Sequence, residues 1–106
     1  MTGMETLHFS FDGGHTPAPF APALVGVVAS GNLEVLVESV PGTGCRIDVD
    51  TSARGFGAIW EAVLRDFHDR HDVGGIAVSI HDMGATPAVV SLRLDQAMSA
   101  VRGAPP

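Results

Sequence analysis

Hydrophobic and polar positions alternate along the first half of the chain, which predicts β-strands there. Leu7, Phe9 and Phe11 occupy every second position, and polar residues stand between them. A period of two residues is typical of a strand with one buried face. On short runs of this kind, or of β-branched apolar residues, four strands are expected, over residues 6–12, 23–29, 33–40 and 46–50.

The second and third predicted strands are separated only by Ser30, Gly31 and Asn32. Glycine and asparagine adopt positive φ angles more readily than other residues, so they suit tight turns. We therefore expect residues 23–29 and 33–40 to form a β-hairpin with Ser30 at its tip.

The hydrophobic period becomes that of a helix near residue 56. The apolar residues at helical spacing are Phe56, Ile59, Trp60, Val63, Leu64 and Phe67. Residues at these intervals lie on one face of a helix, and charged residues occupy the other face, so this is the clearest helix in the chain. Thr51 or Ser52 is expected to cap the start of this helix, and Gly74-Gly75 lies just past its end.

The last third of the chain predicts one more strand and one more helix. Residues 76–80 alternate as a strand does. Thr86-Pro87 is typical of a helix cap followed by the first helical position, and apolar residues then recur at helical spacing as far as Val101. Residues 90–94 also fit a strand, which leaves the start of this helix open.

The predicted order is β-β-β-β-α-β-α. It indicates an α+β fold, with a mainly antiparallel sheet and two helices. We expect one domain over residues 4–102, because a chain of 106 residues suffices for a single core. Residues 1–3 and 103–106 are expected to be loose termini.

Composition and charge exclude several classes of function. The formal net charge is −6, whereas nucleic-acid binding requires a basic face. The chain has no lysine, which excludes Schiff-base chemistry and a P-loop lysine. One cysteine favours a reducing compartment, so a cytoplasmic location is predicted. No apolar run reaches the roughly 18 residues of a membrane span, so no membrane insertion is expected.

Two histidine motifs could carry chemistry, but a structural role is favoured for both. His68 and His71 could bind a metal, yet no third ligand stands at a characteristic spacing, and a histidine also suits a helix C-terminus. His81 and Asp82 could act as an acid–base pair, but adjacent residues of a strand point to opposite faces. No metal site is expected.

The remaining candidates are a lone thiol and two carboxylates. Cys45 could be a nucleophile, but a single cysteine is more often an inert thiol of a turn or core. Asp48 and Asp50 share one face of a predicted strand, where they could do acid–base work. An exposed strand face is the commoner reason for such a pair. No catalytic residue is therefore assigned.

Ser30 differs from these candidates because its predicted place is exposed and sterically open. Backbone N–H groups of a tight turn can form a small anion-binding concavity. A phosphorylated or phosphodiester-linked serine is suited to such a place, since the added charge stays solvated or contacts those N–H groups.

Three segments resemble the malonate decarboxylase acyl carrier protein family, also called the delta subunit. Residues 26–36 contain Ser-Gly-Asn-Leu-Glu, which is similar to the modification segment of that family. Residues 53–57 read Ala-Arg-Gly-Phe-Gly, and residues 82–94 read Asp-x-Gly-Ala-Thr-Pro-Ala-Val-Val-x-Leu-Arg-Leu. The likeness spans about residues 24–97. The citrate lyase acyl carrier family is more distantly similar.

The resemblance implies a non-catalytic carrier of acetyl and malonyl groups. It assigns a covalent 2′-(5″-phosphoribosyl)-3′-dephospho-CoA arm to Ser30 through a phosphodiester, with Gly31 in the turn beside it. Expected partners are an acetyl/malonyl transferase subunit, a two-subunit decarboxylase and the enzyme that attaches the arm. The Asp-Ser-Leu helix start of phosphopantetheine carriers is missing, so a four-helix carrier is not expected. Arg54 could contact a phosphate of the arm or a partner carboxylate, although an ordinary surface role is slightly favoured.

Three alternatives remain open from the sequence. The chain could be a citrate lyase carrier with the same arm, or an unmodified docking subunit. An independent small hydrolase that uses His81 or Cys45 is disfavoured, because no pair of catalytic groups is brought together by the sequence.

Overall fold

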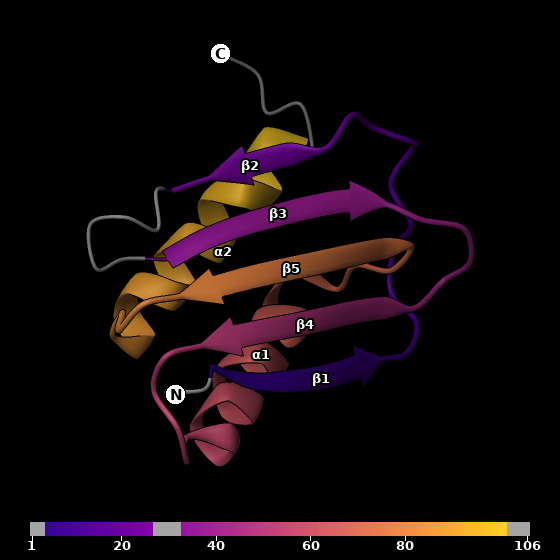
Figure 1. Cartoon of the computed structure of the whole chain (residues 1–106). Helices are drawn as coiled ribbons and strands as arrows, with labels where there is room; N and C mark the ends of the chain where they lie inside the picture. Colours follow the sequence, from indigo (N-terminus) through magenta and orange to yellow (C-terminus); the bar gives the residue numbers. More distant parts are fainter. Residues whose placement is uncertain (1–3, 27–32, 102–106) are drawn as a thin grey trace.

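The computed structural model describes residues 4–26 and 33–101. Its elements are, in order, β1 (Glu5–Phe11), β2 (Ala23–Val25), β3 (Leu33–Ser39), β4 (Cys45–Thr51), α1 (Gly57–His71), β5 (Ile76–Asp82) and α2 (Pro87–Val101). The predicted α+β class and element order are confirmed, and residues 90–94 are helical. The fold is a sheet with two helices, as predicted, and not a four-helix bundle (Figure 1).

One five-stranded sheet organises the chain, with strand order β1-β4-β5-β3-β2. The β4–β5 pair is parallel, with α1 as the connecting element, and the other three pairs are antiparallel. The predicted pairing of the second and third strands is confirmed, because β2 and β3 are antiparallel neighbours. The expected turn at Ser30 and residues 27–29 of the expected strand lie outside the described residues.

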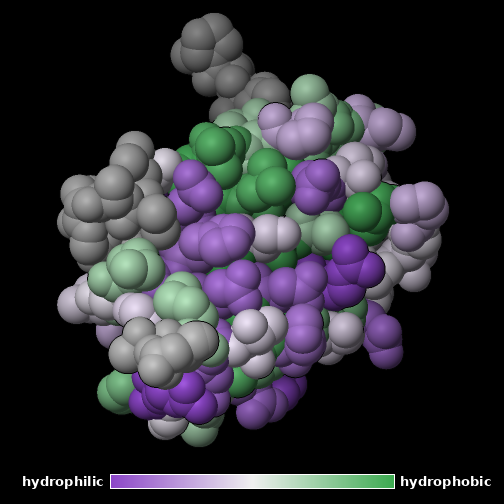
Figure 2. Space-filling model, in the orientation of Figure 1, coloured by the Kyte–Doolittle hydropathy of each residue, from purple (hydrophilic) through white to green (hydrophobic). Residues whose placement is uncertain are grey.

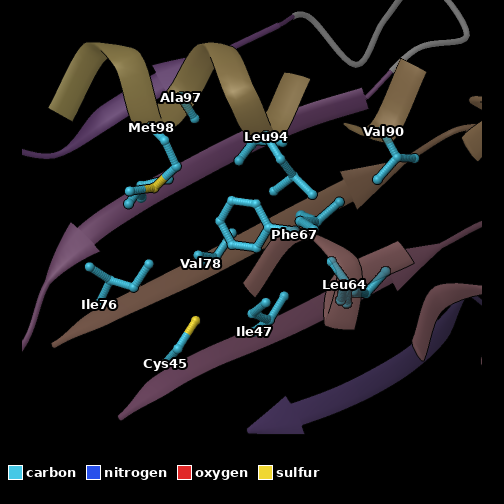
Figure 3. Packing of buried hydrophobic residues seen from close by; sticks show 14 of the residues in the cluster. Cys45, Ile47, Leu64, Phe67, Ile76, Val78, Val90, Leu94, Ala97 and Met98 are labelled. Atoms are coloured by element: carbon cyan, nitrogen blue, oxygen red, sulfur yellow. The ribbon is translucent and has the colours of Figure 1, made fainter. Parts of the chain in front are cut away.

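Both helices pack on the same face of the sheet, and Figure 1 looks onto the opposite face. Alternate residues of β3, β4 and β5 point towards the helices and are buried, as the period of two predicts. Phe67 and Leu64 of α1 meet Leu94 and Met98 of α2 over these strands (Figure 3). The resulting core is mostly aliphatic, with Phe67 as its largest fully buried side chain.

The apolar face of α1 is only partly buried. Trp60, Leu64 and Phe67 are buried, but Phe56 and Ile59 are each 46% exposed. Periodicity identifies the residues that share a helix face, but it does not show how far along that face a neighbour reaches. Here the N-terminal ends of α1 and α2 are separated by a pocket, so the first apolar residues of the stripe lie at its wall.

The predicted caps of α1, Thr51 or Ser52 and Gly74-Gly75, are wrong. The helix begins after Phe56, which makes no capping side-chain hydrogen bond, while Thr51 hydrogen-bonds Asp82 instead. The left-handed residue at the C-terminus is Asp72, with φ of 48°. Gly74 serves close packing, because a Cβ atom there would collide with the carbonyl oxygen of Thr43.

Replacement of Phe67 by alanine tests this description of α1. Because Phe67 is fully buried, Phe67→Ala is expected to lower the unfolding free energy by about 3–5 kcal/mol. Phe56→Ala removes the same ring from a half-exposed position and should cost less than about 1 kcal/mol. Urea denaturation of both variants measures the difference, and equal losses would contradict the exposed position of Phe56.

Candidate functional site

The ends of the segment that contains Ser30 meet at one end of the sheet. Ser30 and Gly31, the predicted attachment residues, lie outside the described residues, whereas Gly26 and Leu33 flank them on either side. Gly26 has φ of +95°, and a Cβ atom there would collide with the carbonyl oxygen of Leu33. Only glycine therefore fits this contact, which closes the chain between β2 and β3 at its base.

A cation from α2 lies against this base. The Nε and Cδ atoms of Arg93 lie 3.2 and 3.3 Å from the place that a Cβ atom on Gly26 would occupy. The Nε is buried and has no hydrogen-bond partner among the described residues, and Nη1 donates only a long hydrogen bond of 3.4 Å to Gln96. Sequence reasoning did not single out Arg93, although it stands in the Leu-Arg-Leu run that the resemblance quoted.

The charge of Arg93 is not matched by a carboxylate in the described part of the chain. Arg46, Arg65 and Arg70 each lie within 4 Å of a carboxylate, at 3.8, 2.8 and 2.8 Å. An arginine without such a partner is available to bind another anionic group, such as a phosphate. Its planar guanidinium offers several hydrogen-bond donors for this purpose. Arg54 was considered from the sequence as a phosphate contact. It is exposed and lies between β4 and α1.

Asp82 organises the same end of the sheet. It is 2% exposed, ends β5, and stands beside Leu33 in the sheet register. Thr51 donates a hydrogen bond of 2.8 Å to its Oδ2, and the N–H groups of Gly84 and Ala85 donate to its Oδ1 at 3.2 and 2.8 Å. The carboxylate thus holds the loop that leads from β5 into α2. A structural role replaces the acid–base role considered for Asp82.

An apolar pocket of about 280 Å³ lies beside this loop, between the N-terminal ends of the two helices. Its wall includes Phe56, Ile59, Trp60 and Val63 of α1 and its approach, together with Ala85 and Val90. Asp82 is the one ionisable residue among the described residues of the lining. The sequence pattern placed the lining residues of the first helix on one face, but it did not point to a pocket there.

The open face of the sheet is polar, with hydrophilic residues over much of it in Figure 2. The expected exposed face for Asp48 and Asp50 is confirmed by the register. His8 Nδ1 lies 2.7 Å from Asp48, and His81 Nε2 lies 3.5 Å from Asp50. These side chains are 39–72% exposed, so each pair contributes at most about 1 kcal/mol to the free energy of unfolding. His81 and Asp82 do point to opposite sides, as predicted.

His68 and His71 contact different partners in the structure. The His68 ring stacks on Phe11, while His71 Nε2 lies 2.7 Å from Asp95 Oδ1. Burial raises the pKa of Asp95, but hydrogen bonds from His71 and Arg70 outweigh it and hold that pKa below its ordinary value. Within residues 4–26 and 33–101, no three potential ligands gather as a metal centre.

Cys45 is a core thiol in this structure. It is 1% exposed, and burial raises its pKa to about 11. The thiolate is the reactive form of cysteine, so this residue is unsuited to act as a nucleophile near neutral pH. The inert role expected from the sequence agrees with this burial.

None of the helices that the structure describes is long and apolar enough to cross a membrane.

Comparisons with known proteins agree on one family. The family model of the malonate decarboxylase delta subunit matches residues 21–101. A malonate decarboxylase acyl carrier protein of Burkholderia cepacia is 64% identical over 100 residues, which cover 94% of this chain and 93% of that protein. A second, from Xanthomonas axonopodis pv. citri, is 61% identical over 103 residues, covering 95% and 98%.

A chain of a solved structure has the same fold. The chain comes from the crystal structure of a Pseudomonas malonate decarboxylase hetero-tetramer in complex with malonate. The matched chain is 40% identical, with a TM-score of 0.82, and the match covers 92% of this chain and 98% of that chain. The resemblance drawn from residues 24–97 is therefore confirmed, and it extends over nearly the whole chain.

The burial of Cys45 predicts slow reaction with thiol reagents. Raising the pKa from 9.0 to about 11 lowers the thiolate fraction at pH 8 about a hundredfold. Labelling of the folded chain with a disulfide reagent should be slower by at least that factor than labelling in urea. Because the unfolded thiol ionises first, the unfolding free energy should also fall as the pH rises from 9 towards 11. Equal labelling rates would contradict a buried thiol.

Proposed function

This chain belongs to the malonate decarboxylase delta subunit family, and we propose that it carries acetyl and malonyl thioesters on an arm attached to Ser30. At the coarser level it is an acyl carrier subunit of malonate decarboxylase. The proposed arm is 2′-(5″-phosphoribosyl)-3′-dephospho-CoA, joined to the serine oxygen by a phosphodiester. Gly31, which has no side chain, follows the proposed attachment residue in the sequence.

The observation that carries the attachment proposal is Arg93 against the base of the Ser30 segment. A phosphodiester keeps one negative charge at neutral pH. The guanidinium of Arg93 packs on Gly26, and it has no ion-pair partner among the described residues. It could therefore neutralise a phosphate of the arm without first breaking another ion pair.

The carrier supplies the attachment point, and its partners make and break the bonds. A transferase subunit would replace the acetyl group on the thiol of the arm with a malonyl group. Malonate is taken up in this exchange, and acetate is released. A two-subunit decarboxylase would then replace the terminal carboxylate with a proton, releasing carbon dioxide and regenerating the acetyl thioester. Tethering keeps the thioester at high effective concentration near both active sites. The named subunits are part of the proposal, which a multi-subunit relative supports.

The chain's acidity fits this role. A formal charge of −6 favours association with basic surfaces on partner enzymes. The names of the similar proteins favour malonate decarboxylase over citrate lyase. Whether the chain is a carrier or an unmodified docking subunit depends on whether Ser30 is modified. The cytoplasmic location inferred from the single cysteine stays a prediction.

Replacement of Ser30 tests the attachment site. Co-expression of the chain with the arm-attaching enzyme should add the mass of the phosphodiester-linked arm to the peptide that contains Ser30. Ser30→Ala should abolish this addition, because the attacking hydroxyl is missing, while Ser52→Ala at an exposed turn should not. Intact mass and peptide mapping measure both. If the wild-type chain stays unmodified while the enzyme modifies another carrier, the carrier function is excluded. The docking-subunit hypothesis would then remain.

Replacement of Arg93 tests the role of the cation. Arg93→Gln should slow arm attachment about tenfold, as expected for loss of a charge-assisted hydrogen bond of about 1.4 kcal/mol. Arg65→Gln, on the far helix and paired with Glu61, is the matched control. The ³¹P chemical shift of the phosphodiester in loaded protein should change in Arg93→Gln only. Identical rates and shifts would exclude a contact between Arg93 and the arm.

A further inference from the structure

The apolar pocket between the helices has the size and chemistry of a small acyl site. Its volume of about 280 Å³ is near the lower end of ligand pockets, which start at about 300 Å³. Phe56 and Ile59 at its wall are each 46% exposed, a large apolar area to leave in contact with water. A small apolar group that filled the pocket would remove part of that area from water.

The pocket lies within reach of the proposed attachment residue. Ser30 is three residues from Leu33, a stretch of chain that spans at most about 11 Å. Leu33 pairs with Asp82, and neighbouring strands lie about 5 Å apart. Asp82 in turn lines the pocket. An arm that joins a pantetheine chain, a pyrophosphate and two ribosyl units is longer than this path when extended.

The lining distinguishes between the two acyl groups. Among the residues that the structure describes, the lining contains no basic side chain, and its one ionisable group is the buried carboxylate of Asp82. A malonyl carboxylate would lose its hydration there without gaining an ion-pair partner, which is costly. The methyl group of an acetyl thioester carries no such cost.

We propose that this pocket receives the acetyl thioester at the end of the arm, and leaves the malonyl thioester in solvent. The inference rests on the proposed function, since it takes the arm to be attached at Ser30. The tether lets a weak site suffice, because it holds the thioester at about millimolar effective concentration. Exclusion of water from the thioester carbonyl would slow hydrolysis of the acetyl form, while the malonyl form stays free to meet the decarboxylase.

Amide resonances of the loaded chain give the direct test. Spectra of ¹⁵N-labelled protein are compared with the arm as free thiol, acetyl thioester and malonyl thioester. Resonances of Ile59, Trp60 and Ala85 are expected to shift in the acetyl form only. Absence of any acetyl-specific shift would overturn the proposal.

A pair of identical substitutions tests protection of the thioester. Ala85→Leu fills the pocket, whereas Ala88→Leu adds the same side chain at an exposed position of α2 outside it. A pocket occupied two-thirds of the time slows hydrolysis about threefold, because only the free third reacts. Ala85→Leu should remove this factor for the acetyl form, and Ala88→Leu should not. Should Ala85→Leu fail to fold, Ile59→Ser against Leu92→Ser repeats the comparison at half-exposed positions.

The remaining outcomes separate this inference from its premise. Unchanged hydrolysis with weaker binding to the decarboxylase subunits would assign the pocket to a partner's side chain and overturn the proposal. If intact mass shows that no arm attaches, the proposed function fails by itself. In that case free S-acetylpantetheine is titrated into the unmodified chain. Saturable shifts at the same three amides would support the pocket as a thioester site, and their absence would overturn it.

Discussion

The pairing of β5 with two neighbours is the constraint on which the rest of this molecule depends. β5 joins β4 in parallel and β3 in antiparallel register at the middle of the sheet. Parallel pairing requires a crossover between the strands, which α1 supplies. β5 then ends at Asp82, whose carboxylate holds the loop into α2. One buried strand therefore sets the places of both helices and of the sheet end where Gly26 and Leu33 meet.

Covering only one face of the sheet divides the molecule into two surfaces. The covered face contains the aliphatic core, and the open face presents Asp48, Asp50 and His81 to solvent. Pairs this exposed add little to stability, but a net negative charge acts over longer distances. In the proposed carrier role, such a surface favours encounter with basic surfaces on partner enzymes. The apolar core and the charged pairs thus lie on opposite faces of the sheet.

The candidate site combines residues that are distant in the sequence and close in space. Gly26 and Leu33 meet across the base of one segment, and Arg93 of α2 packs against that base. Beside the loop that follows β5, the helix ends leave an apolar pocket. Cys45, a candidate nucleophile in the sequence, is instead buried in the core with a raised pKa. The arrangement fits the proposed role of holding a charged, acylated arm.

The sequence by itself determined the element order, because the periods of two and 3.6 residues depend on each residue's near neighbours only. A family resemblance, and not any period or spacing, led to the prediction of Ser30 as the attachment residue. Tertiary structure decided the strand order, the exposure of Phe56 and Ile59, and the contact of Arg93 with Gly26. These features depend on where distant segments pack, and a helix stripe looks the same in the sequence whether a neighbour covers it or leaves a pocket.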